Sequence, residues 1–366
     1  MSPEHYPEPR SGDTAHPPVS TCDPGMTPAP HHSYRHEAFL YGGQDEFLSG
    51  VSEFVLDGVE AGQAVMVAVA EPKLSLLRTT LGAAAAHVRF VDMGELGANP
   101  ARIIPGWQEF VTSSPGPIRG IGEPIWAGRS RAELVEAQLH EALLNVAIAP
   151  DVPLWLMCPY DVDSLEPEVI EEAGRSHPVL ADGTRNQGSR SYGGSHHIDA
   201  LFRSPLEGPE AELGPWSDQT SWSDQTSWPD AATAADRAVG SAPAPWLDPS
   251  LRFDHTLLPE VHSRVLRTAV EAGLTAARAR VLGAGMLDIA DESVRYGGGG
   301  TLRAWSTPDA VICEIQAPGR LDDPLVGRRS EPDGRGRGVW LANQVCDLAQ
   351  VRTVDDTVVV RVHCRH

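Results

Sequence analysis

Two carboxylates in the C-terminal third of the chain, Asp288 and Glu292, stand four residues apart. Asp288 and Glu292 lie in a stretch, 281–296, whose apolar residues follow helical spacing, so both side chains project from one face of a predicted helix. Like charges at this spacing do not stabilise a helix, which favours a functional reason for the pair. The four glycines at 297–300 then end the predicted helix.

A glycine-rich loop stands further along the chain. The sequence GRGRG at 334–338 leads directly into an apolar segment, 339–350, that is predicted to be helical. Backbone amides of such a loop, together with the start of the following helix, can hold phosphate. Arg335 and Arg337 either add positive charge to this loop or are exposed loop residues. The acidic helix and the glycine loop together outline a nucleotide pocket.

Residues 246–366 are predicted to form an α+β sandwich around these features. The helices are expected at 262–272, from 276 to the glycines, and after the glycine loop. The strands are expected at 251–254, 301–305, 310–315, 351–353 and 357–363. Strands grouped together with helices on one face are typical of this class.

Residues 35–181 alternate between short apolar runs and amphipathic segments. The run AVMVAVA, 64–70, is typical of a strand buried on both faces of a parallel sheet. The other strands are expected from His36 and at 88–92 and 153–158, and the segment 118–126 is expected to contain a further strand and a glycine-broken turn. The helices are expected at 47–59, 73–82, 103–112 and 131–147. This alternation predicts an α/β sandwich with a mainly parallel sheet.

The N-terminal domain contains polar and aromatic residues suited to a binding site: Asp92, Glu123, Trp126, Arg129, His140, Glu141, Asn145, Tyr160, Asp161 and His177. Structural roles also fit most of them, since Asp161 can cap a turn, and His140 and Glu141 can face solvent on a helix. We find no metal-ligand spacing, nucleophile elbow or phosphate loop here. The residues favour a ligand-binding or interaction domain over an enzyme.

Composition sets limits on partners and compartment. The formal charge of the 366 residues is −21, which argues against direct nucleic-acid binding. Five scattered cysteines fit a reduced cytosol and are expected to be small core residues. No apolar run reaches the ~18 residues of a membrane helix. The sequence predicts a soluble, cytoplasmic protein and leaves open whether it forms a homodimer.

Two segments are predicted to lie outside the folded domains. Residues 1–34, rich in Pro, Ser and His, are expected to be a disordered tail. Residues 182–245 are expected to be a flexible linker lengthened by duplication of WSDQTS at 216–221 and 222–227. Docking of the exposed tryptophans on a partner is the alternative for this repeat.

The motifs GEPIWAGR (122–129), HEALLN (140–145), CPYD (158–161) and SHP (176–178) resemble the DcmR-type sensory domain called MEDS. The resemblance runs from about His36 to Leu180. It implies a bacterial regulator whose N-terminal domain senses a small molecule. Glu123, Trp126, Arg129, His140, Glu141, Tyr160 and Asp161 are the sensory-site candidates.

The C-terminal half resembles the ATP-binding domain of the GHKL group, in its anti-sigma-factor and serine-kinase branch. The segments 285–305, 317–329 and 334–351 carry the resemblance. It implies a Bergerat-type sandwich in which Asp288 stands at the position of the general base and Glu292 at that of the Mg²⁺-binding asparagine. Ala317 replaces the aspartate that reads adenine. Gly319 and the lid glycines Gly334, Gly336 and Gly338 are retained.

These departures have physical consequences for ATP and Mg²⁺. Asp288 has one methylene fewer than a glutamate base, and Glu292 places negative charge beside a polyanionic nucleotide. Loss of the adenine acceptor at Ala317 typically costs ~1–3 kcal/mol. We therefore expect ATP binding to be weak or absent.

Three functions follow from the resemblances. The first is a regulator whose sensory domain controls a kinase-like domain that binds a sigma factor or its antagonist. The second is an active ATP-dependent serine kinase that phosphorylates an anti-sigma-factor antagonist, with Asp288 as base and Glu292 at Mg²⁺. The third and weakest is a histidine kinase, because no dimerisation helix with a phospho-accepting histidine precedes the domain.

Overall fold

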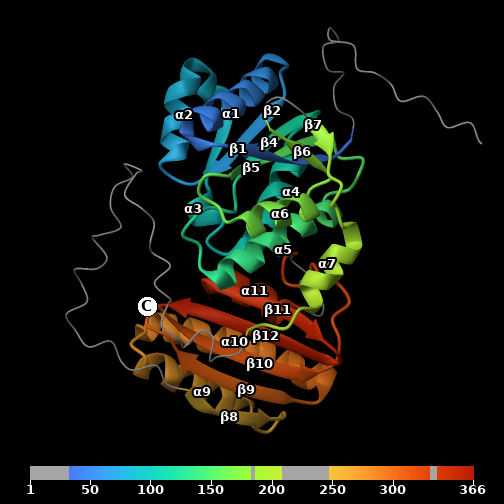
Figure 1. Ribbon diagram of the computed structural model, residues 1–366. Coiled ribbons are helices and arrows are strands. Elements are labelled where there is room, and N and C mark those ends of the chain that lie inside the picture. The colour runs from blue at the N-terminus through green and yellow to red at the C-terminus, as the bar shows by residue number, and fades with distance from the viewer. Residues whose placement is uncertain (1–32, 183–185, 208–246, 330–335) are drawn as a thin grey trace, which may run out of the picture.

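The computed structural model describes residues 33–182, 186–207, 247–329 and 336–366, and its elements are shown in Figure 1. Outside the described residues lie 1–32 of the predicted tail, the WSDQTS repeat, Gly334 and Arg335. No helix in the described part of the chain is long and apolar enough to cross a membrane.

The N-terminal domain is built on a seven-stranded sheet of order β3-β2-β4-β5-β1-β6-β7. All pairings are parallel except that of β7 with β6. The strands are β1 (Arg35–Tyr41), β2 (Ala64–Val69), β3 (Val88–Asp92), β4 (Ile118–Gly122), β5 (Leu154–Asp161), β6 (Val179–Ala181) and β7 (Asn186–Gly188). The prediction of a mainly parallel sheet is confirmed.

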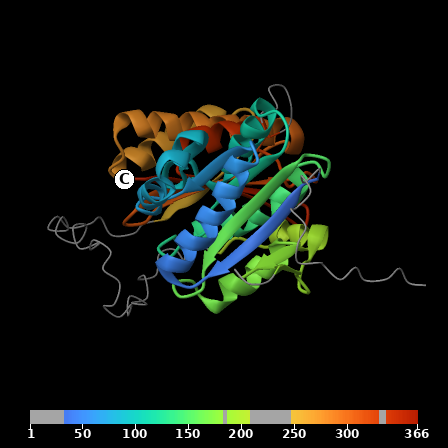
Figure 2. The ribbon, with the colours of Figure 1, turned by 90° about the horizontal axis from the view of Figure 1, so that it is seen from above.

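Helices cover both faces of this sheet. They are α1 (Gly43–Glu60), α2 (Lys73–Leu81), α3 (Met93–Leu96), α4 (Ile103–Ser113), α5 (Arg131–Ala147), α6 (Pro167–Ser176) and α7 (Gly194–Arg203). Helices α1 and α2 share one core with the sheet, while α4, α5 and α6 share another on the opposite face. Figure 2 shows α1 lying over its face of the sheet. The strand β2 is buried on both faces, as its apolar run predicts.

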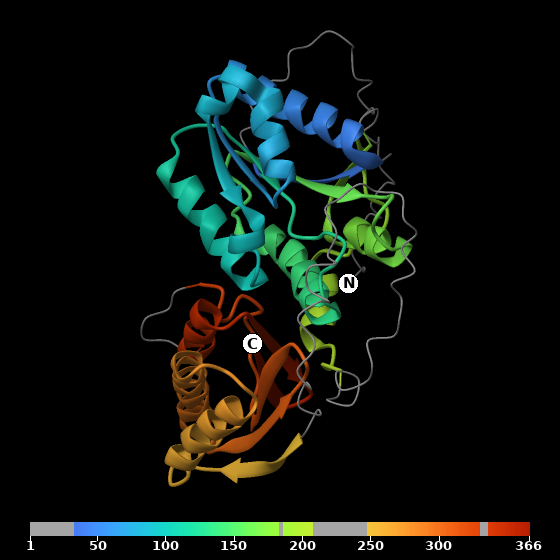
Figure 3. The same ribbon diagram turned by 90° about the vertical axis from the view of Figure 1, so that its left-hand side faces the viewer.

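The C-terminal domain is an antiparallel five-stranded sheet of order β11-β12-β10-β9-β8. Its strands are β8 (Leu247–Phe253), β9 (Gly300–Ser306), β10 (Ala310–Pro318), β11 (Leu348–Val354) and β12 (Thr357–Arg365), and its helices are α9 (Leu258–Glu271), α10 (Ala276–Gly297) and α11 (Arg337–Val345). Figure 3 shows the three helices on one face of the sheet. This two-layer arrangement confirms the predicted α+β class.

The long helix α10 follows its predicted pattern closely. Leu282, Met286 and Ile289 are buried in the C-terminal core. The helix ends at Gly297, and Gly298 adopts a left-handed conformation with φ of 76° that suits glycine.

Two predictions about element limits are wrong. The helix after the glycine loop ends at Val345, and residues 348–350 belong to β11, because the backbone there pairs with β12. The predicted linker contains β7 and α7. Ile198 and Phe202 of α7 are buried against the two domain cores, so Gly194–Arg203 is folded rather than flexible.

Candidate functional site

Glu141 lies at the centre of a buried polar cluster in the N-terminal domain. The other members are His36 from β1, Cys158 from β5 and His177, which follows α6. Glu141 Oε2 lies 3.1 Å from His36 Nε2 and 3.3 Å from His177 Nε2, and Cys158 Sγ lies 3.4 Å from His36 Nε2. Imidazole, thiol and carboxylate are all metal-ligand types. We therefore name these four residues the HECH cluster.

Burial determines the electrostatics of the HECH cluster. Desolvation, reinforced by His177, lowers the pKa of His36. Desolvation acts to raise the pKa of Glu141, but interactions with His177 and His36 outweigh it and hold that pKa well below its usual range. Desolvation also raises the pKa of the Cys158 thiol. The cluster thus combines an ionised carboxylate with a neutral His36 imidazole in the absence of any added cation.

The expectation that His140 and Glu141 face solvent is wrong. Both side chains are buried, because α5 is covered by the sheet on one side and by the C-terminal domain on another. His140 lies outside the HECH cluster, and burial lowers its pKa to about 3. Tyr160 packs edge-on against His177 with ring centroids 5.5 Å apart. It therefore belongs to the wall of the cluster.

Glu123 belongs to a second polar group, at the carboxyl ends of the parallel strands. Its Oε1 accepts hydrogen bonds from Lys73 Nζ at 2.5 Å and from Tyr41 Oη at 3.1 Å. Burial raises the pKa of Glu123, and Lys73 opposes this rise. Ligands of open α/β sheets commonly bind at this edge. Asp161 lies at the same edge and caps a turn by accepting the amide hydrogen of Asp163, as its structural interpretation predicts.

We expect Lys73→Met to make stability more sensitive to pH. Without the ammonium group, the pKa of buried Glu123 rises further above its unfolded value. A raised native pKa favours the folded state at low pH, and that contribution is lost as pH rises through it. The loss of unfolding free energy relative to wild type should therefore grow between pH 4.5 and pH 8, by ~1.4 kcal/mol per unit of added pKa shift. Urea denaturation at several pH values measures it; a pH-independent loss would contradict the prediction.

Trp126 and Arg129 fix the loop after β4. Arg129 stacks on the Trp126 ring with its guanidinium carbon 3.7 Å from the ring centroid, and it donates hydrogen bonds to the carbonyl oxygens of Pro124 and Gly97. These contacts occupy the Arg129 side chain. They place both residues in the support of the loop rather than in the HECH cluster.

Three of the predicted nucleotide residues of the C-terminal domain, Glu292, Gly336 and Gly338, lie in contact. Glu292 of α10 accepts hydrogen bonds from the backbone amides of Gly336 and Gly338 at the start of α11, the second at 3.1 Å. The Glu292 carboxylate therefore lies at the start of α11, bonded to the backbone amides and next to the positive end of the helix dipole. The GHKL resemblance places a nucleotide phosphate at this position. Asp288 is exposed on the same helix, and partial burial raises its pKa against the opposing effect of Arg337.

The glycines of this region allow close packing. A Cβ atom on Gly338 would lie 2.8 Å from the Ile289 amide nitrogen and 2.9 Å from the Asp288 carbonyl carbon, so α11 touches the α10 backbone directly. Gly319 has φ of 128° and donates its amide hydrogen to the Asp356 carbonyl. Ala317 is buried in the sheet core. The donor set thus suits an internal carboxylate better than Mg·ATP, since phosphate would have to displace Glu292.

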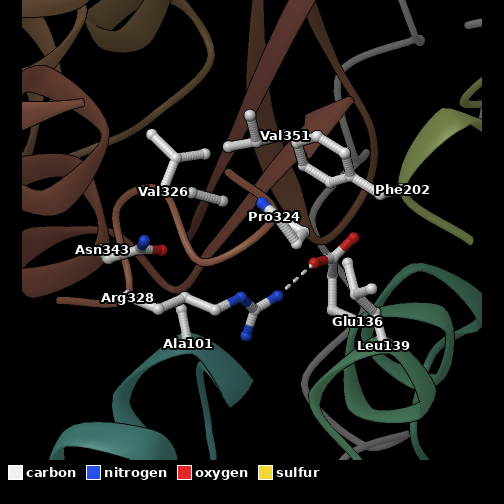
Figure 4. A pocket seen from close by; sticks show the side chains of 10 residues that line it. Ala101, Glu136, Leu139, Phe202, Pro324, Val326, Arg328, Asn343 and Val351 are labelled. Carbon is white, nitrogen blue, oxygen red and sulfur yellow. Dashed lines mark hydrogen bonds and ion pairs between the residues drawn. The ribbon is translucent and has the colours of Figure 1, made fainter. Parts of the chain in front are cut away.

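The two domains meet through a buried polar interface. Glu136 of α5 pairs with Arg328 at 2.9 Å and with Arg352 of β11 at 2.5 Å, and all three side chains are buried. Figure 4 shows Glu136 and Arg328 facing each other across a cavity lined by both domains. The cavity volume is only ≈ 10 Å³, enough for at most one water molecule. This cavity is a small packing gap in the interface between the two domains and is too small to bind a ligand.

Helix α11 is held by the N-terminal domain at its C-terminal end. Arg102 donates hydrogen bonds to the carbonyl oxygens of Asn343, Gln344 and Cys346. Asn99 donates to the Asn343 side chain at 3.0 Å. A cation at this end of a helix is favourable because the free carbonyls carry partial negative charge. The same short helix therefore contacts Glu292 at its start and the N-terminal domain at its end.

The structure is an α/β domain with a buried polar cluster, joined to a two-layer α+β domain. Residues 35–178 match the family model described as MEDS, the MEthanogen/methylotroph, DcmR Sensory domain, so this part of the chain is a MEDS domain. No curated protein matches the chain. The match supports a role in signalling. The GHKL resemblance of the C-terminal domain lies outside it and stays a prediction.

The HECH cluster was not predicted from the sequence, although three of its members lie in the motifs that carry the MEDS resemblance. Glu141, Cys158 and His177 each occur in one of the segments 140–145, 158–161 and 176–178. The expectation that Cys158 is only a small core residue is incomplete, because its sulfur contacts His36. The sequence signal for the cluster was that each of these three motifs contains a residue of a type that can bind a metal ion.

Proposed function

We propose that this protein is a signalling regulator in which the MEDS domain controls a GHKL-type domain that binds a sigma factor or its antagonist. The observation that carries the proposal is the buried contact of the sensory domain with α11, through Arg102 and Asn99. A change in the sensory domain can reach α11 directly through this contact. No flexible connection is needed to carry the signal.

In this proposal the GHKL-type domain acts by presenting a protein-binding surface, and nucleotide is not required. Glu292 supports this part, because its carboxylate already satisfies the Gly336 and Gly338 amides. To bind here, phosphate would have to displace the Glu292 carboxylate, which accepts hydrogen bonds from the same two amides. The buried Ala317 offers no side-chain acceptor for adenine.

The alternative is an ATP-dependent serine kinase that acts on an anti-sigma-factor antagonist. The observation that favours it is the retention of two glycine amides at the start of α11, close to the exposed carboxylate of Asp288. In this alternative Asp288 would accept the proton of the substrate hydroxyl. Glu292 would have to leave the amides before it could reach Mg²⁺.

Calorimetric titration of the full chain with the sigma factors and anti-sigma-factor antagonists of its own organism tests the proposal. We expect one of them to bind in the absence of nucleotide, and Mg·ATP to leave its affinity unchanged. Transfer of radiolabel from γ-labelled ATP to an antagonist would establish the kinase alternative. Absence of binding to every sigma factor and antagonist, with and without Mg·ATP, would overturn both.

A further inference from the structure

We propose that the HECH cluster, His36, Glu141, Cys158 and His177, binds one divalent transition-metal ion of the Zn²⁺ class. The inference goes beyond the proposed function by assigning a metal to the MEDS domain. It concerns the N-terminal domain alone, so it holds whatever the C-terminal domain binds.

The four donor atoms converge from separate elements of the fold. His36 and Cys158 lie on the neighbouring strands β1 and β5, on the sheet face covered by α5 and α6. Glu141 comes from α5, and His177 caps the C-terminal end of α6. Their ligand atoms all lie within 4.8 Å of one another, and all four residues are buried. The residues therefore surround a common point inside the protein.

The histidine tautomers are fixed by partners that can only accept hydrogen bonds. His177 Nδ1 lies 2.9 Å from the Ala173 carbonyl oxygen, so this nitrogen carries a hydrogen. His36 Nδ1 lies 3.1 Å from Asn145 Oδ1. The Asn145 amide group donates to the carbonyl oxygens of Ser176 and Ala142, which identifies Oδ1 as the acceptor. His36 Nδ1 must then also be a donor.

With Nδ1 of each ring engaged in this way, Nε2 is the nitrogen that faces the Glu141 carboxylate, at 3.1 Å for His36 and 3.3 Å for His177. A metal ion between these atoms would be bound by Nε2 of both rings and by a carboxylate oxygen. Among the described residues, His177 Nε2 and Glu141 Oε1 are buried without any hydrogen-bond partner. Such orphaned groups are costly in a dry interior. Bonds from Nδ1 to a carbonyl or amide oxygen are the usual support of metal-binding histidines.

Charge and distance both suit a small divalent ion. A thiolate at Cys158 and a carboxylate at Glu141 would balance the two positive charges of the ion. The metal-bound site would then have no net charge inside the protein. Tetrahedral zinc with bonds of about 2.0–2.3 Å places neighbouring ligand atoms about 3.3–3.8 Å apart. The observed pairs at 3.1, 3.3 and 3.4 Å need only a small expansion.

The donor set also discriminates between metals. Thiolate and imidazole favour zinc and other late first-row ions, whereas magnesium and calcium prefer oxygen ligands. Four protein ligands in a closed site are typical of structural zinc rather than catalytic zinc. We therefore assign the ion a role in holding β1, β5, α5 and the end of α6 together.

Metal analysis and cobalt spectroscopy of the full-length protein, purified without a histidine tag, test the assignment. We expect one zinc ion per chain. After removal of zinc by a chelator, Co²⁺ should give the visible bands of a tetrahedral site and a thiolate-to-cobalt charge-transfer band. Chelation should lower the melting temperature, and Zn²⁺ should restore it.

Variants locate the ion. Cys158→Ser should abolish the charge-transfer band, and His177→Gln should abolish stoichiometric binding. Cys313→Ser and His140→Gln, which replace buried residues of the same types outside the HECH cluster, should keep both signals. If a cluster variant does not fold, the chelation and cobalt measurements on wild type still decide. Folded wild type that contains no stoichiometric metal and shows no cobalt spectrum would overturn the proposal.

Discussion

Replacing Glu136 by glutamine is expected to lower the free energy of unfolding by about 3–5 kcal/mol. The substitution keeps the size of the side chain but removes the only negative charge that the described residues place against Arg328 and Arg352. Both guanidinium groups would remain buried, and burial already lowers the pKa of Arg328. Equilibrium denaturation of the full chain in urea measures the loss.

Two controls separate this effect from ordinary surface electrostatics. Glu171→Gln removes an exposed partner of Arg175 and should cost less than about 1 kcal/mol. The triple change Glu136→Leu, Arg328→Met and Arg352→Met should recover most of the stability, because no charge is then left buried. A loss in Glu136→Gln no larger than that in Glu171→Gln would show that the interface charges are solvated.

Replacing Glu292 by asparagine is expected to increase the affinity for Mg·ADP by about ten- to a hundredfold. The change frees the amides of Gly336 and Gly338 from an internal anion and removes negative charge beside the phosphates. Hydrogen bonds to charged groups contribute about 1.5–3 kcal/mol, and 1.4 kcal/mol corresponds to a factor of ten. Calorimetric titration of the full chain provides the measurement.

The neighbouring carboxylate offers a matched control for this experiment. Asp291→Asn removes one negative charge from the same helix turn, where the carboxylate pairs with exposed Arg295. It should leave nucleotide affinity close to that of wild type. Equal gains in the two variants would mean that net charge alone matters and that the amide contacts of Glu292 do not block the site.

Local features of the fold were predictable because they depend on residues close in sequence. The apolar run of β2, the amphipathic helix α5 and the glycine end of α10 each have a periodicity or a stop signal of their own. The end of α11 was missed because the apolar segment continues through residues that pair with β12. Periodicity in a short apolar run does not distinguish helix from strand.

The candidate sites depended on contacts that no local pattern contains. His36 and His177 are far apart in the chain and meet because β1 lies between β5 and β6 in the sheet. Their side of the sheet follows from the register, which sequence alone does not give. The sequence placed Glu292 and the glycine loop in one predicted nucleotide site, but the direct hydrogen bonds from the Gly336 and Gly338 amides to Glu292 depend on a backbone conformation that no local pattern contains.

The interleaving of the two cores limits how this protein could have been assembled from modules. Phe202, which lies within the predicted linker, packs in the C-terminal core, while Leu325 of the C-terminal half packs in the N-terminal core. A fragment of the protein that starts at residue 246 would therefore lack a side chain that fills its own hydrophobic core. Exchanging this sensory module for another by recombination would require α7 and the segment around Leu325 to change with it. The two domains should accordingly be inherited as one unit.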